Sequence, residues 1–374
     1  MRSAISCAAI AAFAAAGALT ACSSPRPAAG PFAPAVVPPP PALAQGTASA
    51  WVPQRTSADA ELRGLSVLGD KLAWASGAKG TVLRTVDGET WTALTVPGAE
   101  AYDFRDIEAF DANTAIVMGA GPGAASRMYR TRDGGVTWQL MVVNQEPEGF
   151  WDAMAFWDAR NGIVFGDPVR GAFSILLTTD GGESWQPVND PKGLAALPQE
   201  GAFAASGTCL SVGGKGDAWF VTGGAAQSRV FRSVDRGHNW QAATLQIPAA
   251  AASKGAFSVG FDGKGRGLVV GGDYKEPGLG TLNGAVSGDG GAGWSPAQIL
   301  PSGFMSAVVP VPGTNGTFVA VGLAGSGYTR DGGKSWTIIE KETKLNAVGF
   351  TASGNGWAVG PKGLVVKYVG PPIK

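Results

Sequence analysis

The residues of this sequence that could perform acid–base chemistry are few, and nearly all are carboxylates. The chain has one histidine, His238, and three cysteines among 374 residues. These counts argue against a histidine-dependent triad, a thiol redox pair and most zinc sites. Asp106 and Asp152 remain as catalytic candidates, because glycoside hydrolysis uses two carboxyl groups about 5 to 10 Å apart. For both aspartates we favour a structural role, with local capping or pairing to Arg105 and Arg170.

Charge and composition restrict the function further. The chain has 29 basic and 29 acidic residues, so no net field gathers a polyanion, and a nucleic-acid partner is disfavoured. No Gly-x-Gly-x-x-Gly sequence follows a strand and opens a helix, so we expect no nucleotide or flavin cofactor, and we expect no bound metal. Charged residues make up 16% of the chain, and it contains 57 glycines and 25 prolines, a composition typical of a turn-rich protein.

One short peptide recurs along the chain with the pattern Ser/Thr-x-Asp-x-Gly-x-x-Trp. Five copies are complete, and a sixth copy, at residues 85–91, has lost one residue of the turn. In such a peptide the carboxylate accepts loop N–H groups, glycine supplies a positive φ, and tryptophan begins the next strand. The aspartates of the six copies are Asp87, Asp133, Asp180, Asp235, Asp289 and Asp331, and the tryptophans are Trp91, Trp138, Trp185, Trp240, Trp294 and Trp336.

These peptides resemble the BNR or Asp-box repeat of sialidase-type β-propellers. The resemblance implies that each box joins the third and fourth strands of a blade, away from the ligand face, and that its aspartate is structural. Successive box tryptophans lie 47, 47, 55, 54 and 42 residues apart, which fits four short strands per unit. After the last box, residues 345–368 supply three more strands, and Trp51 begins a strand like those that follow the boxes. We therefore predict an all-β, seven-bladed β-propeller over residues 49–374, closed by the N-terminal strand.

The ligand face of such a propeller contains the loops that enter the first strands and those that join the second and third strands. Alignment of the first strands places Gly64, Asp106, Asp152, Thr208 and Asn346 at equivalent positions. We predict a polar binding face on blades two to five, with an exposed Trp151 as an anchor. Its residues are Arg105, Asp106, Trp151, Asp152, Asp167, Arg170, Glu200, Ser206, Arg229, Asp273 and Tyr274.

Two long excursions occur on this face. One separates Trp185 from Cys209 by 24 residues, and the other is a glycine-rich stretch at residues 271–284. Loops longer than about 12 to 15 residues in a compact fold are usually functional. We interpret residues 200–207 as a loop that covers the mouth of the central channel, and the alternative is an inert surface excursion.

The N-terminal region has the features of an export signal. Arg2 precedes an apolar run at residues 8–21 that is shorter than the roughly 20 residues of a membrane helix, so we interpret residues 1–21 as a signal peptide. The sequence Leu19-Thr20-Ala21-Cys22 resembles the lipobox of bacterial lipoproteins, which implies lipidation of Cys22. Residues 22–48 form a Pro/Ala-rich tether. A plain secretory signal is the alternative. Cys209 is then the one cysteine of the folded part, and we expect it to pack as a small hydrophobe.

Beyond the boxes, the mature region resembles the photosystem II stability and assembly factor group of lipoprotein or lumenal propellers. This resemblance implies a non-catalytic scaffold that binds a protein partner. We therefore expect a monomeric protein of the cell envelope, anchored to a membrane by lipid, with an envelope protein or a glycan as partner. The alternative is a glycoside hydrolase, sialidase-like or xyloglucanase-like, that uses Asp106 and Asp152. The arginine triad and the tyrosine–glutamate pair of sialidases are not recoverable from the sequence.

Overall fold

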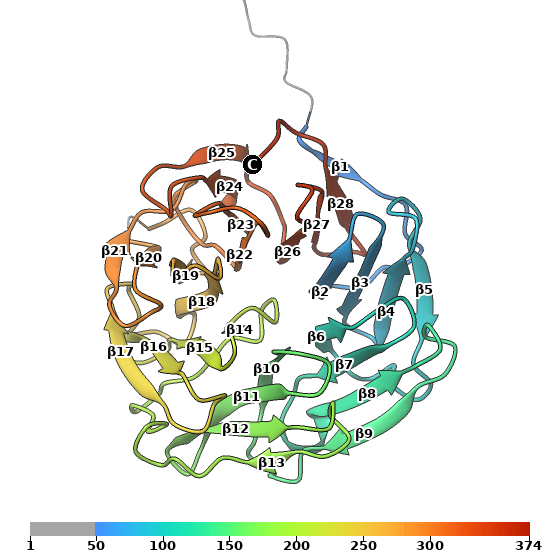
Figure 1. The fold of residues 1–374 in the computed structure, drawn as a ribbon, viewed down its shortest axis with the longest axis horizontal. Helices are drawn as coiled ribbons and strands as arrows, with labels where there is room; N and C mark the ends of the chain where they lie inside the picture. The colour runs from blue at the N-terminus through green and yellow to red at the C-terminus, as the bar shows by residue number, and fades with distance from the viewer. Residues whose placement is uncertain (1–48, 281) are drawn as a thin grey trace, which may run out of the picture. The chain divides into compact units, whose positions relative to one another are not determined.

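The computed structural model describes residues 49–280 and 282–374, and these residues belong to one compact unit. The predicted signal peptide, Cys22 and the tether lie outside the described residues. The compact unit consists of seven antiparallel sheets of four strands each, arranged as blades around a central channel (Figure 1). The all-β, seven-bladed propeller predicted from the sequence is therefore confirmed.

The blades follow the chain in order. Blades 1 to 3 contain β2 (Leu62–Gly69), β3 (Leu72–Gly77), β4 (Thr81–Thr85) and β5 (Thr92–Thr95); β6 (Phe104–Ala109), β7 (Ala115–Gly119), β8 (Arg127–Thr131) and β9 (Gln139–Val143); and β10 (Trp151–Phe156), β11 (Gly162–Val169), β12 (Ala172–Thr178) and β13 (Gln186–Pro187). Blades 4 to 6 contain β14 (Leu210–Gly213), β15 (Asp217–Thr222), β16 (Ser228–Ser233) and β17 (Gln241–Leu245); β18 (Lys254–Phe261), β19 (Gly267–Asp273), β20 (Gly284–Ser287) and β21 (Ser295–Ala297); and β22 (Ala307–Pro310), β23 (Phe318–Gly322), β24 (Gly325–Thr329) and β25 (Thr337–Lys341). A short 3-10 turn, η1 (Gly123–Ala125), lies between β7 and β8.

Blade 7 combines both ends of the described chain. Its strands are β26 (Ala347–Phe350), β27 (Gly356–Val359), β28 (Val365–Tyr368) and, as the fourth, β1 (Trp51–Pro53). Trp51 lies opposite Tyr368 in the antiparallel register. The Trp51 ring is 4% exposed and packs edge-on against Phe350 and Tyr368, while its indole N–H donates to Ser326 Oγ at 3.0 Å. The N-terminal strand is thus fixed to blade 6 as well as to blade 7.

The second strand of a blade shows why the sequence forms this architecture. Strands β7 and β23 read AIVMG and FVAVG, and every residue in them is buried. A strand in the middle of a sheet that is packed on both faces by neighbouring blades needs an unbroken apolar run. The fourth strands lie at the rim and are mostly exposed, as in β5. The first strands β2, β6, β10, β14, β18, β22 and β26 line the channel (Figure 1).

The repeated Asp-containing peptides form the turns between third and fourth strands. In the second of them, Thr131 Oγ1 donates to Asp133 Oδ1 at 2.9 Å and accepts the Gly135 N–H, while Asp133 accepts the Thr137 N–H. Gly134 and Gly135 both have positive φ. Hydrogen bonds from Thr137 lower the pKa of Asp133 to about 2. These exposed aspartates are therefore ionised hydrogen-bond acceptors that hold the turns closed.

Candidate binding site at the channel mouth

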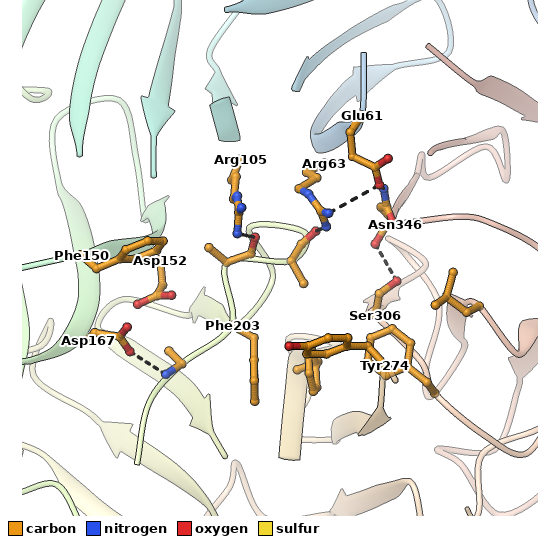
Figure 2. A pocket seen from close by; sticks show the side chains of 16 residues that line it. Glu61, Arg63, Arg105, Phe150, Asp152, Asp167, Phe203, Tyr274, Ser306 and Asn346 are labelled. Atoms are coloured by element: carbon orange, nitrogen blue, oxygen red, sulfur yellow. Dashed lines mark hydrogen bonds and ion pairs between the residues drawn. The ribbon is translucent and has the colours of Figure 1, made fainter. Parts of the chain in front are cut away.

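A cavity of about 380 Å³ opens where the loops before the first strands meet the ends of the second strands (Figure 2). This is the face on which the sequence predicted binding. The cavity is lined by Glu61, Arg63, Arg105, Phe150, Asp152, Asp167, Ala202, Phe203, Ala204, Ala205, Phe257, Tyr274, Phe304, Ser306, Leu323 and Asn346. Six blades and the long loop between blades 3 and 4 therefore contribute to one cavity.

That long loop enters the channel mouth at Gly201. The Gly201 and Gly223 backbones exchange N–H···O bonds of 3.1 and 2.9 Å, and Gly223 also bridges to Gly255. A Cβ atom on Gly223 would lie 2.5 Å from the Lys254 carbonyl oxygen, so this close approach requires glycine. The backbones of Gly201, Gly223 and Gly255 therefore anchor the loop at a close contact that leaves no room for side chains.

Glu200 stabilises the same part of the loop through buried polar contacts. Its side chain is fully buried and forms an ion pair with Arg229, and its Oε1 accepts the Thr222 hydroxyl at 2.6 Å. Its Oε2 also accepts the Leu197 N–H at 2.8 Å. A buried carboxylate with this many donors is a structural element. Glu200 and Arg229, both predicted to belong to the binding face, therefore hold the loop rather than line the cavity.

The tip of the loop, residues 202–207, reaches blades on the other side of the channel. Arg105 and Arg63 donate to the carbonyl oxygens of Ala204 and Ala205, each at 3.4 Å. Ser206 Oγ donates to the Ser306 carbonyl at 3.0 Å. These contacts confirm the predicted loop across the channel mouth. Ser206 is buried and connects the loop to blade 6, and it does not line the cavity.

Aromatic rings form one wall of the cavity. Phe203, from the loop, stacks on Phe257 with ring centroids 3.7 Å apart and an interplanar angle of 10°. Phe304 and Tyr274 pack edge-on against Phe257 at 4.7 and 6.1 Å. Tyr274 remains 42% exposed. The wall therefore combines a rigid apolar surface with one accessible phenol, a composition typical of binding sites.

The charged groups of the cavity fall into two kinds. Arg105 Nε is 2.8 Å from Asp103 Oδ2, and Arg63 Nη2 is 3.5 Å from Glu61 Oε1, so each arginine has an acidic partner. Asp152 and Asp167 are on the Phe150 side of the cavity, away from Glu61 (Figure 2). Burial, followed by the nearby Asp167 charge, raises the pKa of Asp152 well above its ordinary value. Burial also raises the pKa of Asp167.

Asp106 does not line this cavity. Its two carboxylate oxygens accept the backbone N–H groups of Ile107 at 2.8 Å and of Met154, in the next blade, at 2.7 Å. Burial nevertheless raises the pKa of Asp106 to about 7. The structure therefore does not form the catalytic pair of Asp106 and Asp152 that the sequence offered as an alternative. The two carboxylates that do share the cavity are those of Asp152 and Asp167.

The other aligned first-strand positions also connect neighbouring blades. Thr208 Oγ1 is 2.6 Å from Ser258 Oγ, and Asn346 Nδ2 donates to the Leu62 carbonyl at 2.9 Å. Gly64 has no room for a side chain, because a Cβ atom there would lie 3.0 Å from the Asp106 backbone. Most of these positions thus connect blades, and two of them, Asp152 and Asn346, also line the cavity.

Three further predicted residues lie outside the cavity. Trp151 was expected to be exposed, but it is 3% exposed in an apolar cluster with Met118 and Met154, because its side chain points between blades 2 and 3. That prediction was wrong. Arg170 is exposed and pairs with Glu146. Asp273 pairs with Lys254 at 3.4 Å.

Sequence reasoning missed the aromatic wall, although Phe203 lies within the loop that it singled out. Phe257 and Phe304 could not be recognised, because each lies in a stretch that reads as ordinary buried strand. His238 lies on a turn between β16 and β17 and lines a different cavity of about 500 Å³, with Trp157 and Arg236. Cys209 is a free, fully buried thiol in the apolar core, as predicted.

Among residues 49–280 and 282–374, no helix is both long and apolar enough to cross a membrane. The ring of seven four-stranded blades, with a loop folded over its channel, places the chain in the class of seven-bladed β-propellers.

Comparison with known proteins supports this class. No family model matches the chain, and no curated protein matches it by sequence. A solved structure described as YCF48 bound to D1 peptide is 18% identical, with 87% of this chain and 98% of that chain covered and a TM-score of 0.62. YCF48 from Cyanidioschyzon merolae is 17% identical, with 86% and 99% covered and a TM-score of 0.62. An ancestral GH74 enzyme is 13% identical, with 86% of this chain and 46% of that chain covered and a TM-score of 0.57. At these identities the likeness is one of fold.

Proposed function

We propose that this protein is an exported, lipid-anchored Asp-box propeller that binds a segment of a membrane or envelope protein and assists its assembly without catalysis. The observation that carries the proposal is the cavity at the channel mouth, where a rigid aromatic wall meets polar and charged side chains and where residues from six blades converge. Aromatic residues and arginine are enriched in protein interfaces, where they act as anchors.

The likeness in fold adds a precedent. One propeller of similar architecture, YCF48, has been solved with a D1 peptide, so a propeller of this kind can bind a polypeptide segment. We infer that Tyr274, the half-exposed ring of the aromatic wall, is in direct contact with the bound segment.

A photo-crosslinking experiment tests this proposal. The photoreactive residue p-benzoylphenylalanine replaces Tyr274 in the full chain, expressed in its native envelope. The matched control carries it at Val136, which is 80% exposed on the turn between β8 and β9. We expect a discrete protein adduct from position 274 that position 136 does not give. Absence of an adduct at 274, or the same adducts from both positions, would contradict the proposal.

The proposed anchor has a separate test. Cys22→Ser removes the thiol that would be acylated, so we expect the full-length protein to leave the membrane fraction while its near-ultraviolet circular dichroism stays unchanged. If the substituted protein keeps both its membrane fractionation and the mass of its mature N-terminus, lipidation at Cys22 is wrong.

Glycoside hydrolysis is the second candidate, because Asp152 and Asp167 share one cavity and both have raised pKa values. A general acid needs such a raised pKa. Turnover of aryl glycosides by the parent protein that is lost in both Asp152→Asn and Asp167→Asn would replace the scaffold proposal. No turnover, together with an adduct at position 274, would support it.

A further inference from the structure

In the part of the chain that the structure describes, some charged groups of the cavity have an ion-pair partner, and others have none. Arg63 is paired with Glu61, and Arg105 with Asp103. These four groups form two ion pairs at the starts of β2 and β6. Within residues 49–280 and 282–374, Asp152 and Asp167 have no cationic group within ion-pairing distance. These two acidic groups lie on one side of the cavity (Figure 2).

Asp152 is also incompletely hydrogen-bonded. Its residue is 1% exposed, and its Oδ2 atom has no hydrogen-bond partner in the described parts of the chain. Asp167 Oδ1 accepts the Ala202 N–H at 2.8 Å, so the loop orients this second carboxylate. A buried carboxylate oxygen without a donor is costly, because its lost hydration is not replaced. Because the Asp152 residue lines the cavity, a hydrogen-bond donor on a ligand can approach this carboxyl group.

The surroundings indicate what kind of donor fits. The rings of Phe150 and Phe203 line the same cavity, and aromatic rings attract organic cations through their π faces. A metal ion fits less well, because Ca²⁺ and Mg²⁺ require about six oxygen ligands, and no group of three His, Cys, Asp or Glu side chains in the described residues could hold one.

We propose that Asp152 and Asp167 form a subsite for a positively charged side chain of the bound partner, a lysine ammonium or an arginine guanidinium. The proposal rests on the proposed function, because it assigns a chemical feature to the polypeptide segment that the cavity binds. The cation would donate to the carboxylates of Asp152 and Asp167 and would offset their mutual repulsion.

The subsite also predicts a pH dependence. The charged or titratable groups around Asp152 are Asp167 from β11, Arg105 from β6, and the buried thiol of Cys209, which precedes β14. The two aspartates must be ionised to attract a cation, and both have raised pKa values. Binding of a cation therefore releases protons, and the affinity rises with pH.

Calorimetric titration of the detergent-solubilised full chain tests the subsite. The probe is the capped tripeptide acetyl-Ala-Lys-Ala-amide, and the uncharged control is the same peptide with norleucine in place of lysine. At about pH 8 we expect roughly tenfold tighter binding of the lysine peptide, and at about pH 5.5 a smaller preference. Asp152→Asn or Asp167→Asn removes the preference. Glu146→Gln, which removes a carboxylate paired with Arg170 outside the cavity, preserves it.

Asp152→Asn removes an unpaired buried charge, so its fold should survive, and circular dichroism checks this. Equal binding of the lysine and norleucine peptides, or an unchanged preference in both aspartate variants, would overturn the subsite. The subsite and the proposed function can fail independently. An adduct from position 274 without lysine preference rejects the subsite but leaves the scaffold proposal standing. Lysine preference that is lost in both variants supports the subsite.

Discussion

Asp106 and Asp152 occupy equivalent positions at the starts of β6 and β10, in adjacent blades, yet they have different surroundings. Both are buried, and burial raises the pKa of each. Asp106 accepts N–H groups with both oxygens and connects blade 2 to blade 3. Asp152 keeps an oxygen without a partner and lines the cavity.

The difference shows how a repeated fold produces a specific site. A position repeated in seven blades has a default structural role, which is to connect one blade to the next. The role differs at Asp152, which lies beside the long loop and, within the described residues, has no side-chain hydrogen bond to the next blade. Before β14 the long loop occupies the channel mouth, and Asp152 faces the cavity beside it (Figure 2). Four sets of substitutions test this difference between the two aspartates and their surroundings.

The largest expected effect is a difference in the free energy of unfolding between substitution of a buried aromatic residue and substitution of an exposed one. Trp151→Ala removes a ring packed between blades 2 and 3, so we expect a loss of about 3–5 kcal/mol in the free energy of unfolding. Tyr274→Ala should change it by less than about 1 kcal/mol, because Tyr274 is 42% exposed. Urea denaturation measures both. Comparable losses in the two variants would contradict the assignment of Trp151 to the core and Tyr274 to the binding surface.

The second change compares the two aspartates directly. In Asp106→Asn the amide nitrogen cannot accept one of the two backbone N–H groups, so we expect a loss of about 1–3 kcal/mol at about pH 5. Asp152→Asn should cost little, because the Asp152 side chain does not bridge two blades in this way. Urea denaturation of the two variants at that pH checks the difference.

The effect of Asp106→Asn also depends on pH. The folded pKa of Asp106, about 7, is above the unfolded value of about 3.9, so the folded state binds the proton more tightly. The contribution of Asp106 to stability is fully present below about pH 4 and is lost as the pH rises through 7. The loss caused by Asp106→Asn should therefore be smaller at about pH 8 than at about pH 5. A larger loss at pH 8 would contradict the raised pKa.

A smaller effect is expected at the turns between third and fourth strands. Thr178 Oγ1 donates to Asp180 Oδ1 at 2.7 Å and accepts the Gly182 N–H at 2.8 Å. Thr178→Ala removes both bonds at the edge of one blade, so we expect a loss of about 1 kcal/mol. Binding at the channel mouth should be unaffected. A change in affinity for the capped lysine peptide would show that the turn and the cavity are coupled.

The smallest effect concerns the charge of the turn aspartates. The pKa of Asp133 is lowered to about 2, so its contribution to stability is present above the unfolded pKa of about 3.9 and is lost as the pH falls through about 2. In acid the stability difference between the parent and Asp133→Asn should therefore shrink. Thermal melts between about pH 5 and about pH 2 measure this trend, and a difference that grows in acid would contradict it.

The sequence predicted the architecture because the repeat is local. Each turn peptide lies within eight residues, and the all-apolar second strands read directly as buried strands. The sequence also predicted the face on which the cavity lies and the loop at residues 200–207, since both follow from strand order and loop length.

The composition of the cavity could not be predicted in the same way. Whether Asp106 or Asp152 faces the cavity depends on the position of the loop at residues 200–207, which lies well after both aspartates in the chain. Trp151 precedes a channel strand, and its burial depends on whether the ring points into the channel or between blades. The stacking of Phe203 on Phe257 depends on the glycine contacts at Gly201, Gly223 and Gly255, which only the folded ring brings together.

The most direct test uses the partner protein that crosslinking from position 274 recovers. Its affinities for Asp106→Asn and for Asp152→Asn are measured side by side. We expect Asp152→Asn to weaken binding roughly tenfold, whereas Asp106→Asn should destabilise the fold but bind like the parent under conditions where it remains folded. The reverse pattern, or equal weakening by both substitutions, would contradict the central claim that Asp152, and not Asp106, belongs to the binding site.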